Sequence, residues 1–219
     1  TRLRDFLPIR YVEPVFRPPS EAQSLILPVT DGCSWNKCTF CEMYTAPQKG
    51  FRARDEAEVL QSIQQTGEQY ADEIRRVFLA DGDALVLPTR RLLTVLQAIR
   101  EHLPAVRRVS TYCLPRNLRK KTVEELRELA DAGLSIAYVG AESGDDEVLE
   151  KVCKGETFET TRDALDSPGA NVERALAVGR KAAAEAGYRL GPGDLTISRG
   201  VVIVQLRATA PTVVLERVG

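Results

Sequence analysis

The chain has 219 residues, of which 43% are hydrophobic, enough for one sizeable core but hardly for a second full domain. Its formal net charge of -1 excludes the broad positive field that supplies most non-specific affinity for nucleic acids. No stretch approaches the roughly 18 apolar residues of a membrane span, and the N-terminus lacks the apolar centre of a secretory signal. We therefore expect a single domain over residues 1–219, without membrane association, in the cytoplasm.

Short apolar runs alternate with amphipathic stretches after an irregular, proline-rich lead-in over residues 1–24. The apolar runs predict strands, and the stretches between them predict helices. In chain order, the expected elements are a strand over Leu25–Val29, a helix from Asp55 to about Tyr70, a strand over Val77–Ala80, a helix over Thr89–His102, a strand over Val106–Tyr112, a helix from Thr122 to Gly133 and a strand over Leu134–Val139. Asp55, Thr89 and Thr122 are the expected caps of the three helices.

This alternation indicates parallel βαβ units, so the fold class is α/β. Residues 158–219 depart from the pattern, because two helices (160–165 and 171–186) follow one another without a strand. Three weak strands come after them, over Leu195–Ile197, Val201–Leu206 and Thr212–Val218, interrupted by Gly and Pro. The expected architecture is a partial (β/α)6 barrel of parallel strands, similar to a TIM barrel and incomplete at its C-terminus.

Three of the five cysteines lie within nine residues, directly after the first predicted strand. The spacing of Cys33, Cys38 and Cys41 is C-x4-C-x2-C, which argues against a disulfide framework and for a metal or cluster site. Three thiolates on one loop can hold three irons of a [4Fe–4S] cubane and leave the fourth iron open to another ligand. Two alternatives stay open: a [2Fe–2S] ferredoxin site with the same spacing and a fourth cysteine, and a structural zinc site with four closed ligands. Cys113 and Cys153 are expected to be small packed residues.

The segment from Gly32 to Tyr44 resembles the cluster loop of the radical S-adenosylmethionine (SAM) superfamily, in the branch of Fe–S oxidoreductases related to coproporphyrinogen oxidases. The commonest spacing in that family is C-x3-C-x2-C, and this chain has one more residue between its first two cysteines. The resemblance covers roughly residues 14–157. It implies two cofactors, a [4Fe–4S] cluster on Cys33, Cys38 and Cys41, and SAM.

The resemblance also implies contacts between the chain and SAM. The residues concerned are Phe40, Asp81, Gly82, Asp83, Glu142 and Ser143. Phe40 matches an aromatic residue that lies near the adenine in the family. Asp81–Asp83 stands where the family has a Gly-Gly-Glu-like motif that binds the methionine amino group. The last two residues follow the fourth strand, where the family contacts the ribose or the amino-acid part.

Position in the fold adds two further candidates, Ser110 and Arg116. The C-terminal ends of parallel strands meet at one mouth, where barrel-type folds build their sites, and segment 110–116 belongs to the third strand end. Arg116 offers a fork for a carboxylate or phosphate, with a solvated surface as the equal alternative. It belongs to a basic run between Val106 and Thr122, which allows contact with RNA or an anionic substrate, although such runs are more often solvated helix ends.

By resemblance, the chain is an enzyme, a radical SAM Fe–S oxidoreductase. The reduced cluster would cleave SAM to a 5′-deoxyadenosyl radical, which would abstract hydrogen from a small or macromolecular substrate that the sequence does not identify. A reductant such as a flavodoxin or ferredoxin would supply the electron. The alternatives are a non-catalytic ferredoxin-like electron carrier, a zinc-binding scaffold, and an inactive fragment of the enzyme, the last because the chain begins at Thr1 and not at methionine.

Overall fold

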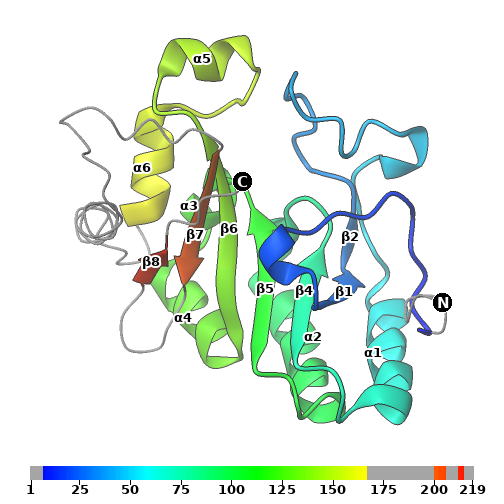
Figure 1. The fold of residues 1–219 in the computed structure, drawn as a ribbon. Coiled ribbons are helices and arrows are strands. Elements are labelled where there is room, and N and C mark those ends of the chain that lie inside the picture. The colour runs from blue at the N-terminus through cyan, green and yellow to red at the C-terminus, as the bar shows by residue number, and fades with distance from the viewer. Residues whose placement is uncertain (1–6, 167–199, 206–211, 215–219) are drawn as a thin grey trace, which may run out of the picture.

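Four parallel strands form the centre of the fold in a computed structural model that describes residues 7–166, 200–205 and 212–214 (Figure 1). The strands lie side by side in the order β1 (Leu25–Pro28), β4 (Arg76–Ala80), β5 (Arg108–Cys113) and β6 (Leu134–Glu142). The helices between them are α1 (Glu56–Tyr70), α2 (Thr89–His102) and α4 (Val123–Asp131). The predicted α/β class, with a partial barrel-like parallel sheet, is therefore confirmed.

The helix caps were predicted correctly in two cases and wrongly in the third. Asp55 accepts a hydrogen bond from the backbone of Glu58 and starts α1, and Thr122 starts α4 through a capping box. Thr89 is not a cap, because α2 begins at Thr89 itself after Pro88. Its hydroxyl instead donates to Glu125 at 2.7 Å, which joins α2 to α4.

The C-terminal strands differ from the prediction in direction. Strand β7 (Gly200–Gln205) pairs antiparallel with β6, and β8 (Thr212–Val214) pairs antiparallel with β7. The expectation of further parallel strands there was wrong. The connection over residues 206–211 is too short for a parallel crossover, which takes about a dozen residues or more. The expected strand Leu195–Ile197 and helix 171–186 lie outside the described residues.

The two faces of the parallel sheet are covered by different parts of the chain. On one face, alternate strand residues form the main core with α1, α2 and α4. On the other, Phe78, Tyr112 and Tyr138 pack edge to face or tilted against one another, and the N-terminal segment covers them. Glu21 ends the short helix η2 (Pro19–Glu21), drawn in blue in front of the strands in Figure 1, and is fully buried. The lead-in thus covers this aromatic face of the sheet.

Short elements missed by the sequence analysis surround the C-terminal ends of the strands. The list comprises β2 (Thr30–Asp31) and β3 (Arg52–Ala53), which pair antiparallel, η3 (Pro47–Lys49), η4 (Ala84–Val86), α3 (Pro115–Arg119) and α5 (Asp146–Lys151). Helix α6 (Phe158–Asp166) was expected and packs against α3. None of the helices in the described ranges combines the length and apolar character that a membrane span requires.

Candidate functional site

The base of the cysteine loop is fastened to the end of β4 by two buried carboxylates. The backbone N–H of Gly32 donates to Asp81 at 3.0 Å, and that of Ser34 donates to Asp83 at 2.9 Å. The Ser34 hydroxyl also donates to Asp83, so both oxygens of this carboxylate are engaged. Burial raises the pKa of Asp83, and the hydrogen bonds from Ser34 and Asn117 oppose that rise. The structure therefore gives the predicted Asp-Gly-Asp segment a loop-holding role.

Gly82 lies between these carboxylates and leaves no room for a side chain. A Cβ there would stand 2.7 Å from the Cβ of Cys33 and 2.9 Å from the ring of Tyr44. Gly32, at the start of the loop, has φ of +70° and would meet the carbonyl oxygen of Lys49 at 2.1 Å. These two glycines let the loop pack directly on the strand end.

A buried ion pair lies beneath the loop. The ammonium of Lys49 donates to Asp81 Oδ2 at 2.6 Å, and neither side chain is appreciably exposed. Burial raises the pKa of Asp81, while the hydrogen bond and charge of Lys49 lower it. Asp81 Oδ1 and the hydroxyl of Tyr44 are buried with no hydrogen-bond partner among the described residues. Such atoms usually mark a place where water or a ligand belongs.

The three cysteines are free thiols, and each is partly exposed. Burial raises the pKa of Cys33, and the charge of Asp83 adds to this. Burial also raises the pKa of Cys38, and the neighbouring charge of Lys154 counteracts it. Irons would bind these groups as thiolates.

This donor set fits a cubane better than a zinc ion. Among the described residues, no group of three or more His, Cys, Asp or Glu side chains could hold a single metal ion. A structural zinc needs four ligands that converge on one point, whereas a cubane takes each thiolate on a different iron.

The outer side of the loop docks on residues 152–156, a segment that we call the strap. The backbone N–H of Thr39 donates to Val152 at 3.0 Å, and the indole of Trp35 donates to the carbonyl of Cys153 at 2.8 Å. Gly155 has φ of +71°, and a Cβ there would lie 2.2 Å from the Trp35 ring. The strap and β4 therefore hold the loop from two sides.

Arg116 is occupied by contacts within the protein. Its guanidinium stacks on Trp35, 4.2 Å from the ring centroid, and donates to Glu156 at 2.7 Å and to the carbonyl of Gly155 at 2.6 Å. Arg119 pairs with the same glutamate, and Arg108 pairs with Glu21. Three arginines of the basic run are thus paired within the protein.

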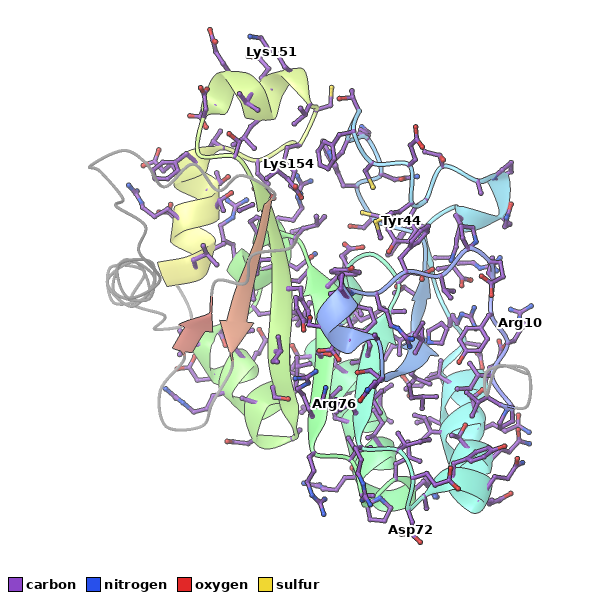
Figure 2. All side chains as sticks on the ribbon, in the orientation of Figure 1. Arg10, Tyr44, Asp72, Arg76, Lys151 and Lys154 are labelled. Carbon is purple, nitrogen blue, oxygen red and sulfur yellow. The ribbon has the colours of Figure 1, made fainter. Side chains whose placement is uncertain are left out.

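The segment after β6 lies opposite the Tyr44 side of the mouth. Glu142 ends β6 and forms an ion pair with Lys154 at 3.0 Å. Figure 2 labels Lys154 below α5 and Tyr44 across the ends of the strands. Ser143 accepts a hydrogen bond from the backbone of Asp145 and shapes the turn into α5.

The two remaining predicted contacts lie in contrasting places. Phe40 is half exposed beside Cys41, free to contact a ligand. Ser110 lies within β5, fully buried, where its hydroxyl approaches the carbonyl of Val77 at 3.5 Å. Because β5 continues to Cys113, Ser110 does not reach the mouth, and its position does not support a contact with SAM.

Four residues of the site were missed from the sequence: Trp35, Tyr44, Lys49 and Lys154. Trp35 is the only tryptophan of the chain and lies within the cysteine motif, a signal that could have drawn attention to it. The buried lysines offered no such signal, since lysine is almost never fully buried unless it is paired.

A parallel α/β sheet with a three-cysteine loop at its strand ends defines the class of iron–sulfur proteins with one cluster iron left open. The chain matches the Radical SAM superfamily over residues 27–167, and it belongs to that superfamily. Membership confirms the two predicted cofactors, a [4Fe–4S] cluster and SAM. The resemblance to the coproporphyrinogen-oxidase branch stays a prediction.

The chain is similar to parts of longer solved structures. The cobalamin-dependent SAM radical enzyme OxsB is 20% identical, with a TM-score of 0.53 over 66% of this chain and 22% of OxsB. The radical SAM methyltransferase TsrM from Kitasatospora setae is 22% identical, with a TM-score of 0.49 over 65% of this chain and 28% of TsrM. The chain therefore spans less than a third of either protein. No curated protein matched the sequence.

Proposed function

We propose that the chain holds its [4Fe–4S] cluster through Cys33, Cys38 and Cys41 and uses it to cleave SAM reductively. The observation that carries this proposal is a loop of three free thiols, fastened by Asp81 and Asp83 on one side and by the strap on the other. When bound and reduced, the cluster supplies one electron to the sulfonium of SAM, which yields methionine and a 5′-deoxyadenosyl radical.

The chain's own residues would orient SAM beside the cluster. Asp81 is a better candidate than Asp83 for the amino group of SAM. Within the described part of the chain, Asp81 Oδ1 has no hydrogen-bond partner, whereas both oxygens of Asp83 accept hydrogen bonds from Ser34. Phe40 offers an exposed ring that an adenine could stack on. Gly82, Glu142 and Ser143 stay candidate contacts of the same mouth.

The substrate, reductant and location belong to the same proposal. We infer that the radical abstracts hydrogen from a small or macromolecular substrate, as an oxidoreductase would, and that a flavodoxin or ferredoxin supplies the electron. A reducing compartment such as the cytoplasm agrees with five free thiols. Because the chain covers only 22% of OxsB, the overall reaction of the whole protein is also a proposal.

The test is the production of 5′-deoxyadenosine from SAM by anaerobically reconstituted protein, followed by chromatography. We expect production that depends on an added reductant, and its loss in the Cys41→Ser variant. Cys153→Ser is the matched control, because Cys153 is an exposed thiol outside the loop, and it should keep the activity. An intact four-iron cluster that yields no 5′-deoxyadenosine would contradict the proposal, and a two-iron cluster would favour a ferredoxin-like carrier.

A further inference from the structure

A buried lysine stands in the middle of the strap, beside the cysteine loop. Only 4% of the Lys154 side chain is exposed, and its ammonium pairs with Glu142 at 3.0 Å. Gly140, on β6 below the pair, makes room for it: a Cβ there would lie 2.7 Å from Glu142 Oε1 and 2.9 Å from Lys154 Nζ. Burial of a lysine costs free energy unless its charge is paired, so the burial of Lys154 depends on Glu142.

Two hydrogen bonds hold the strap on either side of Cys38 along the loop. Trp35 donates to the carbonyl of Cys153, and Thr39 donates to that of Val152. Lys154 is the next residue of the strap and is therefore fixed against the part of the loop that carries Cys38.

Solvent screens the two charges of this pair to different extents. The Lys154 side chain is only 4% exposed, whereas the Glu142 side chain is 25% exposed. Arg116, which stacks on Trp35 of the loop, is neutralised by its own ion pair with Glu156. The less screened charge of the pair is therefore the Lys154 ammonium, and Glu142 offsets it only in part.

We propose that Lys154 acts on the cluster through the ligand Cys38 and raises its reduction potential, with Glu142 as the opposing charge that holds the ammonium in place. The inference rests on the cluster site of the proposed function. Reduction adds one electron from the external reductant to the cluster and neither forms nor breaks a bond, so the cluster becomes more negative. A fixed cation in a poorly solvated place stabilises the more negative state.

The experiment is a redox titration of the full chain, with the reduced cluster followed by electron paramagnetic resonance in the absence of SAM. We expect Lys154→Met, which keeps the length and removes the charge, to lower the equilibrium constant for cluster reduction by about tenfold, or about 59 mV for one electron. Glu142→Gln should raise the potential, and the double variant should return it close to the wild-type value. Lys151→Met is the control, because Lys151 is 74% exposed and solvent screens its charge.

Opposite shifts in the two single variants cannot arise from general damage to the site, so they would support the proposal. Shifts of the same sign, or a shift in Lys151→Met as large as in Lys154→Met, would overturn it. If Lys154→Met does not load four irons, Lys154→Arg replaces it, because arginine keeps the positive charge. The proposal is then supported if Lys154→Arg has the wild-type potential and Glu142→Gln has a raised potential. No shift in Glu142→Gln would then overturn it.

A second readout separates this proposal from two others. SAM should change the electron paramagnetic resonance spectrum of the reduced cluster. If Lys154→Met abolishes this change but keeps the wild-type reduction potential, the Lys154–Glu142 pair contacts SAM, and the effect proposed on the potential is wrong. Absence of 5′-deoxyadenosine with a four-iron cluster contradicts the proposed function alone, since the potentials are measured without SAM.

Discussion

At the end of β4, single residues decide whether the cysteine loop can approach the sheet. Gly82 has the backbone of Cys33 and the ring of Tyr44 within 3 Å of where its side chain would begin. A methyl group at this position has to push the loop away from the strand or tilt Tyr44. The spacing of the thiols therefore depends on a residue that has no side chain.

We predict that Gly82→Ala lowers the iron content of reconstituted protein to less than half of the wild-type value. The overpacking should also lower the free energy of unfolding by about 1–3 kcal/mol. Gly50→Ala is the matched control, because no heavy atom of the described residues lies within 4 Å of its Cβ position. Iron analysis and thermal unfolding measure both effects, and equal iron content in the two variants would contradict the role given to Gly82.

Sequence reasoning placed the site residues better than it assigned their partners. It located Asp81, Asp83 and Glu142 at strand ends, because the end of an apolar run is visible in the sequence. It did not foresee that Asp81 binds Lys49 or that Glu142 binds Lys154. These pairs depend on how the loop and strap fold back over the strand ends, which no local pattern encodes.

The length of a helix or strand decides whether it can be recognised from the sequence. Helices α1, α2 and α4 are long enough to show a repeating apolar face, and capping residues marked the starts of α1 and α4. Strands β2 and β3 have two residues each and can show no periodicity. Their pairing is supported by Asp31, which binds both Arg52 and Arg54.

The contact between the strap and the loop is the element-scale feature that the site depends on. We predict that Gly155→Ala separates the two, because its Cβ would overlap the Trp35 ring and its φ of +71° disfavours any side chain. Since Trp35 is the only tryptophan, its fluorescence should shift to longer wavelength as it becomes solvated, and the cluster should be lost faster in air.

Gly144→Ala is the control for this prediction. Among the residues that the structure describes, its Cβ would meet only Phe158, at an ordinary van der Waals distance of 3.8 Å. An unchanged emission spectrum in Gly155→Ala would show that the strap does not depend on this close approach.

For the molecule as a whole, the N-terminal segment does more than lead into the first strand. Glu21 is buried, accepts a hydrogen bond from Tyr138 at 2.7 Å and forms an ion pair with Arg108 at 3.0 Å. These contacts tie the lead-in to β5 and β6 and cover the face of the sheet that carries Phe78, Tyr112 and Tyr138. The sequence could not indicate this, because an irregular segment shows neither apolar periodicity nor caps.

We predict that Tyr138→Phe lowers the free energy of unfolding by about 1–3 kcal/mol at neutral pH, because a buried hydrogen bond to a carboxylate is lost. Burial raises the pKa of Tyr138 to about 12. A raised pKa favours the protonated folded state, so this stabilisation is complete below pH 10, the usual tyrosine value, and falls as the pH rises towards 12.

The difference between wild type and variant should therefore narrow above pH 10 in urea unfolding. Tyr70→Phe is the control and should change stability by less than about 0.5 kcal/mol, since no hydrogen bond of its hydroxyl is found within the described part of the chain. A gap that widens in alkali would contradict the role of Tyr138.

The direction of the last strands marks the limit of sequence reasoning at this scale. The runs over Val201–Leu206 and Thr212–Val218 were recognised as strands, but nothing in a single apolar run tells whether it pairs parallel or antiparallel. Only the short connection between them argues for the antiparallel pairing that β7 and β8 show.

The central claim, that three thiolates of one loop hold the cluster, is tested most directly by iron and sulfide analysis of the five single Cys→Ser variants after anaerobic reconstitution. We expect about four irons per chain in the wild type, in Cys113→Ser and in Cys153→Ser, and less than one in Cys33→Ser, Cys38→Ser and Cys41→Ser. Two irons per chain in the wild type, or loss of the cluster in Cys153→Ser, would contradict the claim.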